Sequence, residues 1–415
     1  QYAGQSGTVN QTGGALNVLT NYLRVGGGGV GTYRLSGGTV SNTTLYVAAS
    51  SGSTGTVFIS GGSIVGCGGT SESATVGRNP NAYGQVVQTA GLFSLNVSTN
   101  QADFVIGRDY AEGLYELSGG MVTNAKIVYL GMAATVGSHP LGTMVLSGSG
   151  AIYSSVGMYL GYGYTATGVV YQTGGLCMPS SLRIGCVASG NRGFGRYEIS
   201  GGKFVGSLDV GNGGIGTLQI SSNAILETSW FNVGATWSTT GSVFQTGGYV
   251  DTRANALSIG AQTGGFGNYS LTGGSLSNLA SITIGSSGGV GFFSVGGTSV
   301  VSLWTNTWSH PITVANNSAS TGTLQIVGGN VLFKNTQDFT SKQPGSTLDY
   351  LFGSEGISTL SVGWTAYLGG TLSLGLRGGV SLFQTNAFTL ITAAGINGDF
   401  SVKNTSVFLV ATNGT

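Results

Sequence analysis

Short segments in which apolar and polar residues alternate recur along the chain, and each segment runs into a pair of glycines. In residues 31–38, GTYRLSGG, the apolar positions Tyr33 and Leu35 flank the polar Arg34. Residues 113–120 and 195–202 repeat this pattern. Alternation with a period of two predicts a half-buried β-strand. The glycine pair predicts a corner, because glycine adopts positive φ without a steric clash.

A second apolar segment follows each corner. It has the form apolar-x-apolar-Gly, which predicts another short strand that ends at a glycine. Stretches rich in Gly, Ser, Thr and Asn separate the segments and predict loops of variable length. The clearest copies are residues 23–26, 104–107, 182–185, 208–211, 257–260 and 282–285.

The glycine pair, or a substitute for it, recurs about every 26 residues, a period typical of solenoids, propellers and stacked arrays. One such unit has too little apolar surface to fold alone, whereas stacked units bury a continuous core. The sequence therefore predicts an all-β protein, a parallel β-solenoid (β-helix) of about 13 coils. Corners are predicted at residues 13–14, 37–38, 61–62, 90–91, 119–120, 148–149, 174–175, 201–202, 222–223, 247–248, 273–274, 296–297 and 328–329.

A longer period of three coils is superimposed on the first. Glutamine occupies one inward position in every third coil, and tyrosine occupies the other inward position in the coil that follows. A buried glutamine needs hydrogen-bond partners, so we expect each amide to meet the tyrosine hydroxyl of the next coil or the corner backbone. The alternative is that the glutamines line a solvated groove. The residues are Gln11, Gln88, Gln172 and Gln245, with Tyr33, Tyr115, Tyr197 and Tyr269.

The repeat fades near residue 335. The sequence predicts a β-solenoid repeat domain at residues 1–334 and a β-rich C-terminal capping or docking module at residues 335–415, for which a sandwich is one form that fits. The first coil, residues 7–14, starts almost at once, and a solenoid end without a cap is an open template for another chain. We expect the module of one subunit to cover the first coil of the next. In the alternative, each module caps its own solenoid and Gln1–Gln5 fold over the first coil.

Charge and hydropathy limit the classes of function that fit this chain. Charged residues make up 7% of the chain, and 14 Lys and Arg are balanced by 13 Asp and Glu, without the basic run that nucleic-acid binding needs. So little charge gives weak colloidal repulsion and favours assembly. No apolar stretch is long enough for a transmembrane helix. The chain starts at Gln1 without Met, as expected of an exported protein after signal-peptide removal. We therefore expect a secreted, extracellular or cell-surface protein.

Segments such as residues 31–40 and 10–14, followed by a Leu-x-Ile-Gly step, resemble bacterial exported β-solenoid repeat proteins of the autotransporter-associated β-strand and PEP-CTERM type. Residues 388–400 resemble the segment that closes many such repeat regions. The resemblance implies a secreted or cell-surface β-solenoid of bacterial origin. It implies no reaction, and a PEP-CTERM sorting tail and an autotransporter barrel are both absent from the sequence.

The acidic residues do not form a recognisable catalytic pair. Glu116 and Glu198 share an outward position but lie three coils apart, about 14 Å, which is too far for glycoside hydrolysis. Arg183 and Asp209 occupy the same outward position of adjacent second strands, and we interpret them as a surface ion pair.

Residues 108–112, RDYAE, are the densest charge cluster. Asp109 and Glu112 could hold Ca²⁺, although a solvated loop is the preferred interpretation. His139 and His310 lie far apart in the repeat and are interpreted as structural or surface residues. The sequence therefore predicts no catalytic, cofactor-binding or metal-ligating residue and no cofactor.

The cysteines and tyrosines leave alternatives open. Cys177 and Cys186 belong to one coil and could form a disulfide, although buried free thiols are preferred, and Cys67 has no local partner. Three tyrosines occupy the outward slot of the second strand, where aromatic rings bind sugars or simply cover the sheet; the second interpretation is preferred. They are Tyr46, Tyr129 and Tyr159.

The leading hypothesis is a structural protein that self-assembles head-to-tail into an extracellular fibre, sheath or surface layer. Its predicted partner is a further copy of itself, joined through the N-terminal coil and the C-terminal module. The alternative is an adhesin or carbohydrate-binding rod that binds cell-surface glycan through outward Tyr, Asn and Thr ladders or the loops near residues 66–82 and 99–112. A polysaccharide-degrading enzyme is the third hypothesis.

Overall fold

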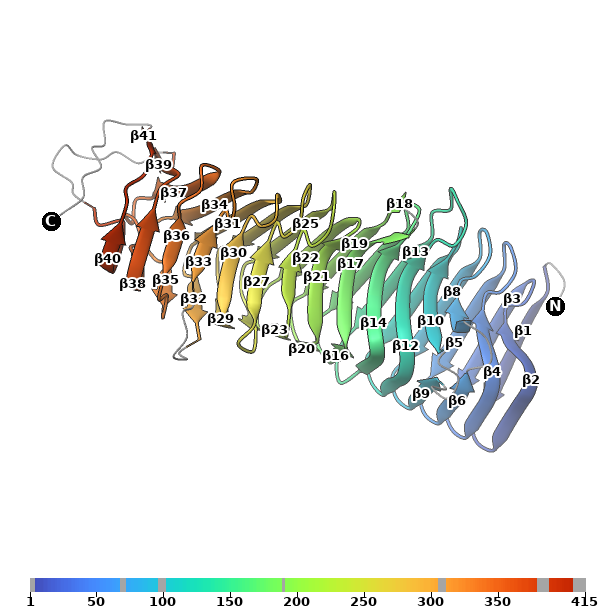
Figure 1. The fold of residues 1–415 in the computed structure, drawn as a ribbon. Coiled ribbons are helices and arrows are strands. Elements are labelled where there is room, and N and C mark those ends of the chain that lie inside the picture. The colour runs from blue at the N-terminus through green and yellow to red at the C-terminus, as the bar shows by residue number, and fades with distance from the viewer. Residues whose placement is uncertain are drawn as a thin grey trace. The chain divides into compact units, whose positions relative to one another are not determined.

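The computed structural model describes residues 4–67, 72–95, 102–188, 191–304, 311–378 and 388–405. The chain is all-β and forms a parallel β-solenoid of about 14 turns. It divides into two compact units, Gln1–Gln219 and Ile220–Thr415. Within each unit, successive turns of chain form the rungs of two parallel ladders (Figure 1). The predicted fold class is confirmed.

Each turn contributes one strand, usually of six residues, to the first ladder, sheet A. A corner follows, and the chain then contributes one long strand or two short strands to the second ladder, sheet B. In unit 1, the sheet A strands are β1 (Ser6–Gln11), β3 (Val30–Leu35), β5 (Thr54–Ile59), β8 (Tyr83–Gln88), β11 (Glu112–Leu117), β13 (Leu141–Leu146), β15 (Thr167–Gln172) and β19 (Phe194–Ile199).

The sheet B strands of unit 1 pair in the same parallel sense, and a short antiparallel pair is added where β18 meets β17. They are β2 (Ala15–Val25), β4 (Thr39–Val47), β6 (Ser63–Cys67), β7 (Glu72–Val76), β9 (Leu92–Leu95), β10 (Asp103–Arg108), β12 (Met121–Met132), β14 (Ala151–Tyr162), β16 (Leu176–Pro179), β17 (Ser181–Ala188), β18 (Asn191–Arg192), β20 (Lys203–Val205) and β21 (Ser207–Asn212). Strand β22 (Ile215–Ile220) contains the division between the units.

Unit 2 repeats the arrangement. Its sheet A strands are β25 (Thr240–Gln245), β28 (Phe266–Leu271), β31 (Val290–Gly296), β34 (Thr321–Val327), β37 (Ser346–Phe352), β39 (Thr371–Leu376) and β41 (Val402–Thr405). Its sheet B strands are β23 (Ile225–Glu227), β24 (Phe231–Val233), β26 (Tyr249–Asp251), β27 (Ala256–Ile259), β29 (Ser275–Leu279), β30 (Ser281–Ile284), β32 (Val300–Leu303), β33 (Ile312–Val314), β35 (Leu332–Lys334), β36 (Phe339–Ser341), β38 (Leu360–Leu368) and β40 (Ile391–Asn397).

The glycine pairs lie along one corner of the solenoid in each unit, as predicted. Gly14 and Gly38 have positive φ, 69° and 81°. The carbonyl oxygen of Gly14 accepts a hydrogen bond from the N–H of Thr39 at 2.8 Å, and that of Gly38 accepts one from Ser63 at 2.9 Å. The corner backbone therefore continues the ladder between turns, and a left-handed residue is required where the chain changes direction.

The glutamine–tyrosine prediction is confirmed at all four positions. The Tyr115 hydroxyl donates to Oε1 of Gln88 at 2.5 Å, and Nε2 of Gln88 donates to the carbonyl oxygens of Gly91 at 3.0 Å and Met121 at 3.2 Å. Tyr33, Tyr197 and Tyr269 donate in the same way to Gln11, Gln172 and Gln245. Gln88, Gln172 and Gln245 are buried. Each of these amides bonds to two backbone carbonyl oxygens and one tyrosine hydroxyl, so its polar atoms have partners inside the core.

The loss of the sequence motif near residue 335 does not interrupt the ladders. In sheet A, β37 pairs in register with β34, and β39 pairs with β37. In sheet B, β38 pairs with β36, and β40 pairs with β38. Residues 335–405 therefore continue the parallel coil in the part of the chain that is described, rather than forming a sandwich. Alternating inward residues such as Leu348 and Tyr350 preserve the core in this region.

Candidate functional site

The turns that lead from sheet B back to sheet A stack on one another, and they contain the predicted charge cluster at residues 108–112. Gly107 lies near the end of β10 with a φ of 72°. A Cβ atom at this position would lie 2.1 Å from the carbonyl oxygen of Leu141 in the next turn. Only glycine fits this close approach. The place where the turn begins is therefore fixed, and so is the backbone that carries the side chains after it.

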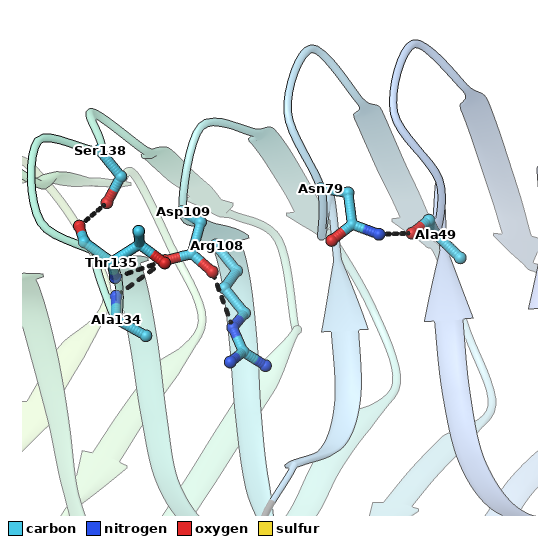
Figure 2. Close-up of polar contacts among 7 residues, drawn as sticks. All are labelled: Ala49, Asn79, Arg108, Asp109, Ala134, Thr135 and Ser138. Carbon is cyan, nitrogen blue, oxygen red and sulfur yellow. Dashed lines mark hydrogen bonds and ion pairs between the residues drawn. The ribbon is translucent and has the colours of Figure 1, made fainter.

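Asp109 joins its own turn to the next one (Figure 2). Its Oδ1 accepts hydrogen bonds from the backbone N–H groups of Ala134 and Thr135, both at 2.9 Å, and its Oδ2 lies 3.3 Å from Nε of Arg108. The Arg108 and Asp109 side chains are only 19% and 18% exposed. The prediction of a solvated loop is therefore wrong at Arg108 and Asp109. The Asp109 carboxylate instead links two successive turns through hydrogen bonds to the backbone.

Side-chain hydrogen bonds to backbone carbonyl oxygens also occur in the neighbouring turns. The Asn79 side chain donates to the carbonyl oxygen of Ala49 in the turn before it, and Ser138 donates to Thr135 within its own turn at 2.7 Å (Figure 2). The alanines Ala48, Ala82 and Ala111 pack together beneath these turns. The arrangement is chemically suited to holding turns in register, because its polar atoms are directed at backbone groups.

This geometry does not support the alternative in which Asp109 and Glu112 hold Ca²⁺. The Asp109 carboxylate accepts two backbone N–H groups and faces Arg108, while Glu112 is the exposed first residue of β11. Across the described residues, no group of three or more His, Cys, Asp or Glu side chains is placed to hold a metal ion.

The other carboxylates lie as the sequence predicts. Glu116 and Glu198 are three rungs apart in sheet A, through Val145 and Tyr171. Glu116 accepts a hydrogen bond from Gln85 at 2.9 Å, and Glu198 pairs with Arg196. They are not brought together as a catalytic pair.

Arg183 and Asp209 pair as predicted. They lie opposite each other on β17 and β21, and Nε of Arg183 is 4.0 Å from Oδ2 of Asp209. The Arg183 guanidinium also lies over the Tyr159 ring, 5.0 Å from its centroid. A half-exposed pair of this kind contributes at most about 1 kcal/mol to folding.

The outward tyrosines cover the sheet, as the preferred interpretation predicted. Tyr129 and Tyr159 are opposite each other on β12 and β14, with ring centroids 5.5 Å apart in an edge-to-face arrangement. Both are buried, and they pack with Val105 and Cys186. Burial raises the pKa of Tyr129 above that of a free tyrosine, and the nearby Asp103 carboxylate raises it further. These rings have little free face left for a sugar.

Cys177 and Cys186 are free and buried, and burial raises the pKa of each thiol to about 12. Such thiols are inert. His139 contacts the Thr165 hydroxyl through Nδ1 at 2.5 Å. His310 and the Cys67 side chain lie outside the described residues, as do residues 68–71 and 99–101 of the loops in the glycan-binding alternative.

No protein family, curated protein or solved structure matches this chain. In the described part of the chain, no helix has the length and hydropathy of a membrane span.

The sequence pattern does not single out the tryptophans. The four that are described are all at least 40% exposed: Trp230, Trp237, Trp304 and Trp364. The sequence offered no periodic signal for them, because none of them occupies an inward position of the repeat.

Proposed function

We propose that this chain is a structural, extracellular protein whose copies assemble head-to-tail into a fibre, sheath or surface layer. The observation that carries the proposal is the outer edge of β1. This strand pairs with β3 on one side, and five of its six residues are exposed, with Val9 54% exposed. An exposed strand edge is a template for a further strand.

The repeat supports such an addition, because the first rungs of sheet A share one register. Gly7 of β1 pairs with Gly31, and Gly31 pairs with Gly55. A further strand with glycine at this position would continue the series without a change in backbone geometry. Gln11 already has partners in Gly14, Thr39 and Tyr33, so the interior of this turn needs no polar group from a neighbour.

Exposed apolar residues also occur near the other end of the described chain, in unit 2. Ile396 of β40 is 50% exposed, and Val402 of β41 is 47% exposed. The formal net charge of +1 leaves little electrostatic repulsion between copies. Contact between unlike ends is heterologous, and it propagates into a filament unless it closes into a ring.

The test removes one outward donor from β1. The carbonyl oxygens of Gln5 and Gln11 accept hydrogen bonds from the N–H groups of Val30, the first residue of β3, and Ser36, which directly follows β3. By the alternation of a parallel ladder, the N–H of Thr8 therefore points away from β3. Thr8→Pro should abolish assembly in sedimentation velocity with little change in the melting temperature, because the lost N–H takes no part in the β1–β3 ladder and an edge strand tolerates proline.

Thr8→Val is the matched control, since it keeps the N–H, and it should assemble like the wild type. A wild-type chain that stays monomeric at all concentrations would refute the proposal. So would a Thr8→Pro variant that assembles as readily as Thr8→Val.

A further inference from the structure

Three of the exposed tryptophans share one corner of sheet B in unit 2. Trp230 lies between β23 and β24, and it is 60% exposed. Trp304 directly follows β32, and its N–H donates to the carbonyl oxygen of Leu279 at 2.9 Å. Trp364 lies in β38 at a shift of register, and its N–H donates to Gln337 at 2.7 Å. We call these three residues the Trp corner.

The ladder register fixes the spacing of the Trp corner. Trp304 belongs to the third turn after that of Trp230, and Trp364 to the second turn after that of Trp304. At a rung spacing of about 4.8 Å, the backbone rungs that carry the three tryptophans are about 14 Å and about 10 Å apart along the stacking direction. The rungs are fixed by the pairings of Phe231 with Leu257, Leu257 with Ile282, Ile282 with Ile312, Ile312 with Phe339, and Phe339 with Ala366.

The charges around the Trp corner are few and of both signs, and they include Lys334, which ends β35 opposite Ser302 and is exposed. Arg253 forms an ion pair with Glu227 and bonds through its N–H to Asp251 at 2.7 Å. Oδ1 of Asp338 accepts the N–H of Thr365 at 3.2 Å. A nucleic acid would need a basic surface, which is absent from this set of residues. Exposed indoles among neutral polar groups suit a ligand with apolar ring faces and many hydroxyl groups.

We propose that the Trp corner binds an extended, neutral polysaccharide that lies along the stacking direction of unit 2. The indoles stack against the C–H faces of sugar rings, and the intervening turns present polar groups to the hydroxyls. A repeating polymer matches a repeating surface, and contacts at three platforms on one chain reinforce one another. This inference does not rest on assembly, and it concerns other residues than β1.

Native electrophoresis in gels that contain soluble xylan, hydroxyethyl cellulose or a mixed-linkage β-glucan tests the proposal. At least one polymer should retard the wild type. The triple variant Trp230→Ala, Trp304→Ala, Trp364→Ala should bind at least about tenfold more weakly. Trp237→Ala is the matched control: Trp237 is 72% exposed and follows β24 at the other end of that strand, so its loss should change the affinity less than about twofold.

Titration of wild-type tryptophan fluorescence with the same polymers keeps the test decisive if the triple variant does not fold. The emission should shift or be quenched, and it should do so equally in Trp237→Ala. Failure of all three polymers to retard the wild type overturns the proposal, as does equal retardation of the triple variant. A triple variant that loses self-association but not retardation also overturns it, because the indoles would then serve an interface between copies.

Discussion

At the scale of single residues, the buried glutamines explain how a chain with few charges specifies its register. Each Gln amide bonds to a corner carbonyl in its own turn and to a carbonyl and a tyrosine hydroxyl in the next. A slip by one turn would leave these groups buried without partners, at a cost of about 1–3 kcal/mol for each group. The sequence revealed this network because both residue types recur every third turn.

Tyr115→Phe removes the donor to Gln88 and leaves a buried amide oxygen without its partner. We expect it to lower the free energy of unfolding by about 1–3 kcal/mol. Tyr171→Phe, on a ring that is 38% exposed, should change it by less than about 0.5 kcal/mol. Urea unfolding followed by circular dichroism measures both, and equal effects would show that the pair is not structural.

The glycine that ends the second strand is replaced by alanine in two turns, at Ala48 and Ala315, with φ of 59° and 52°. Ala315→Gly should raise the melting temperature slightly, because it relieves a left-handed alanine that costs about 1–2 kcal/mol. The reverse change, Gly285→Ala, should destabilise strongly, since its Cβ would lie 2.2 Å from the carbonyl oxygen of Thr321. Thermal melts in which both variants lose stability would contradict this argument.

Asp103 provides a pH-dependent test. Its burial raises the pKa of the carboxyl group, an effect that Lys126 only partly offsets. The folded state therefore disfavours the charged form, so the cost is absent below the unfolded pKa of about 3.9 and grows as pH rises above it. Asp103→Asn should raise the melting temperature at pH 7 and leave it unchanged at pH 3. A gain of equal size at both pH values would mean that charge burial is not the cause.

At the scale of strands and turns, the sequence predicted what is periodic and missed what depends on the neighbouring turn. The alternating strands and the glycine corners repeat, so they could be recognised. The sequence predicted a solvated loop at Asp109 because its partners, Ala134 and Thr135, lie in a turn of a different length. No repeat spacing connects these residues in the sequence. The ladders after residue 335 were missed because a parallel strand needs only backbone groups and inward apolar residues, and β37 and β39 supply both.

The three-turn period can be tested by deletion within unit 1. Removal of residues 113–194 joins two positions of equal register and should place Tyr197 over Gln88, where Tyr115 lay. Removal of residues 168–194 also joins equal positions, but it leaves the Tyr197 hydroxyl over Met144 and Leu146. The longer deletion should therefore melt at the higher temperature and more cooperatively.

Stability in a solenoid otherwise grows with the number of turns. A simple count of turns thus predicts the opposite order of the two melting temperatures. That order, measured by circular dichroism, would show that the glutamine–tyrosine pairs carry no register information.

At the scale of the whole molecule, the chain combines a repeated interior with a surface of little charge and a strand edge that is exposed at β1. The interior could be predicted from sequence, because burial imposes a pattern on it. The Trp corner could not, since an exposed residue leaves no periodic trace and its neighbours are set by the register of sheet B.

Cryo-electron microscopy of the concentrated wild-type chain tests the proposed function most directly. The account predicts filaments in which the strand spacing of about 4.8 Å continues without a break from one copy to the next, with β1 on one side of the junction. Fields that contain only single copies, or filaments in which the edge of β1 faces solvent, would contradict it.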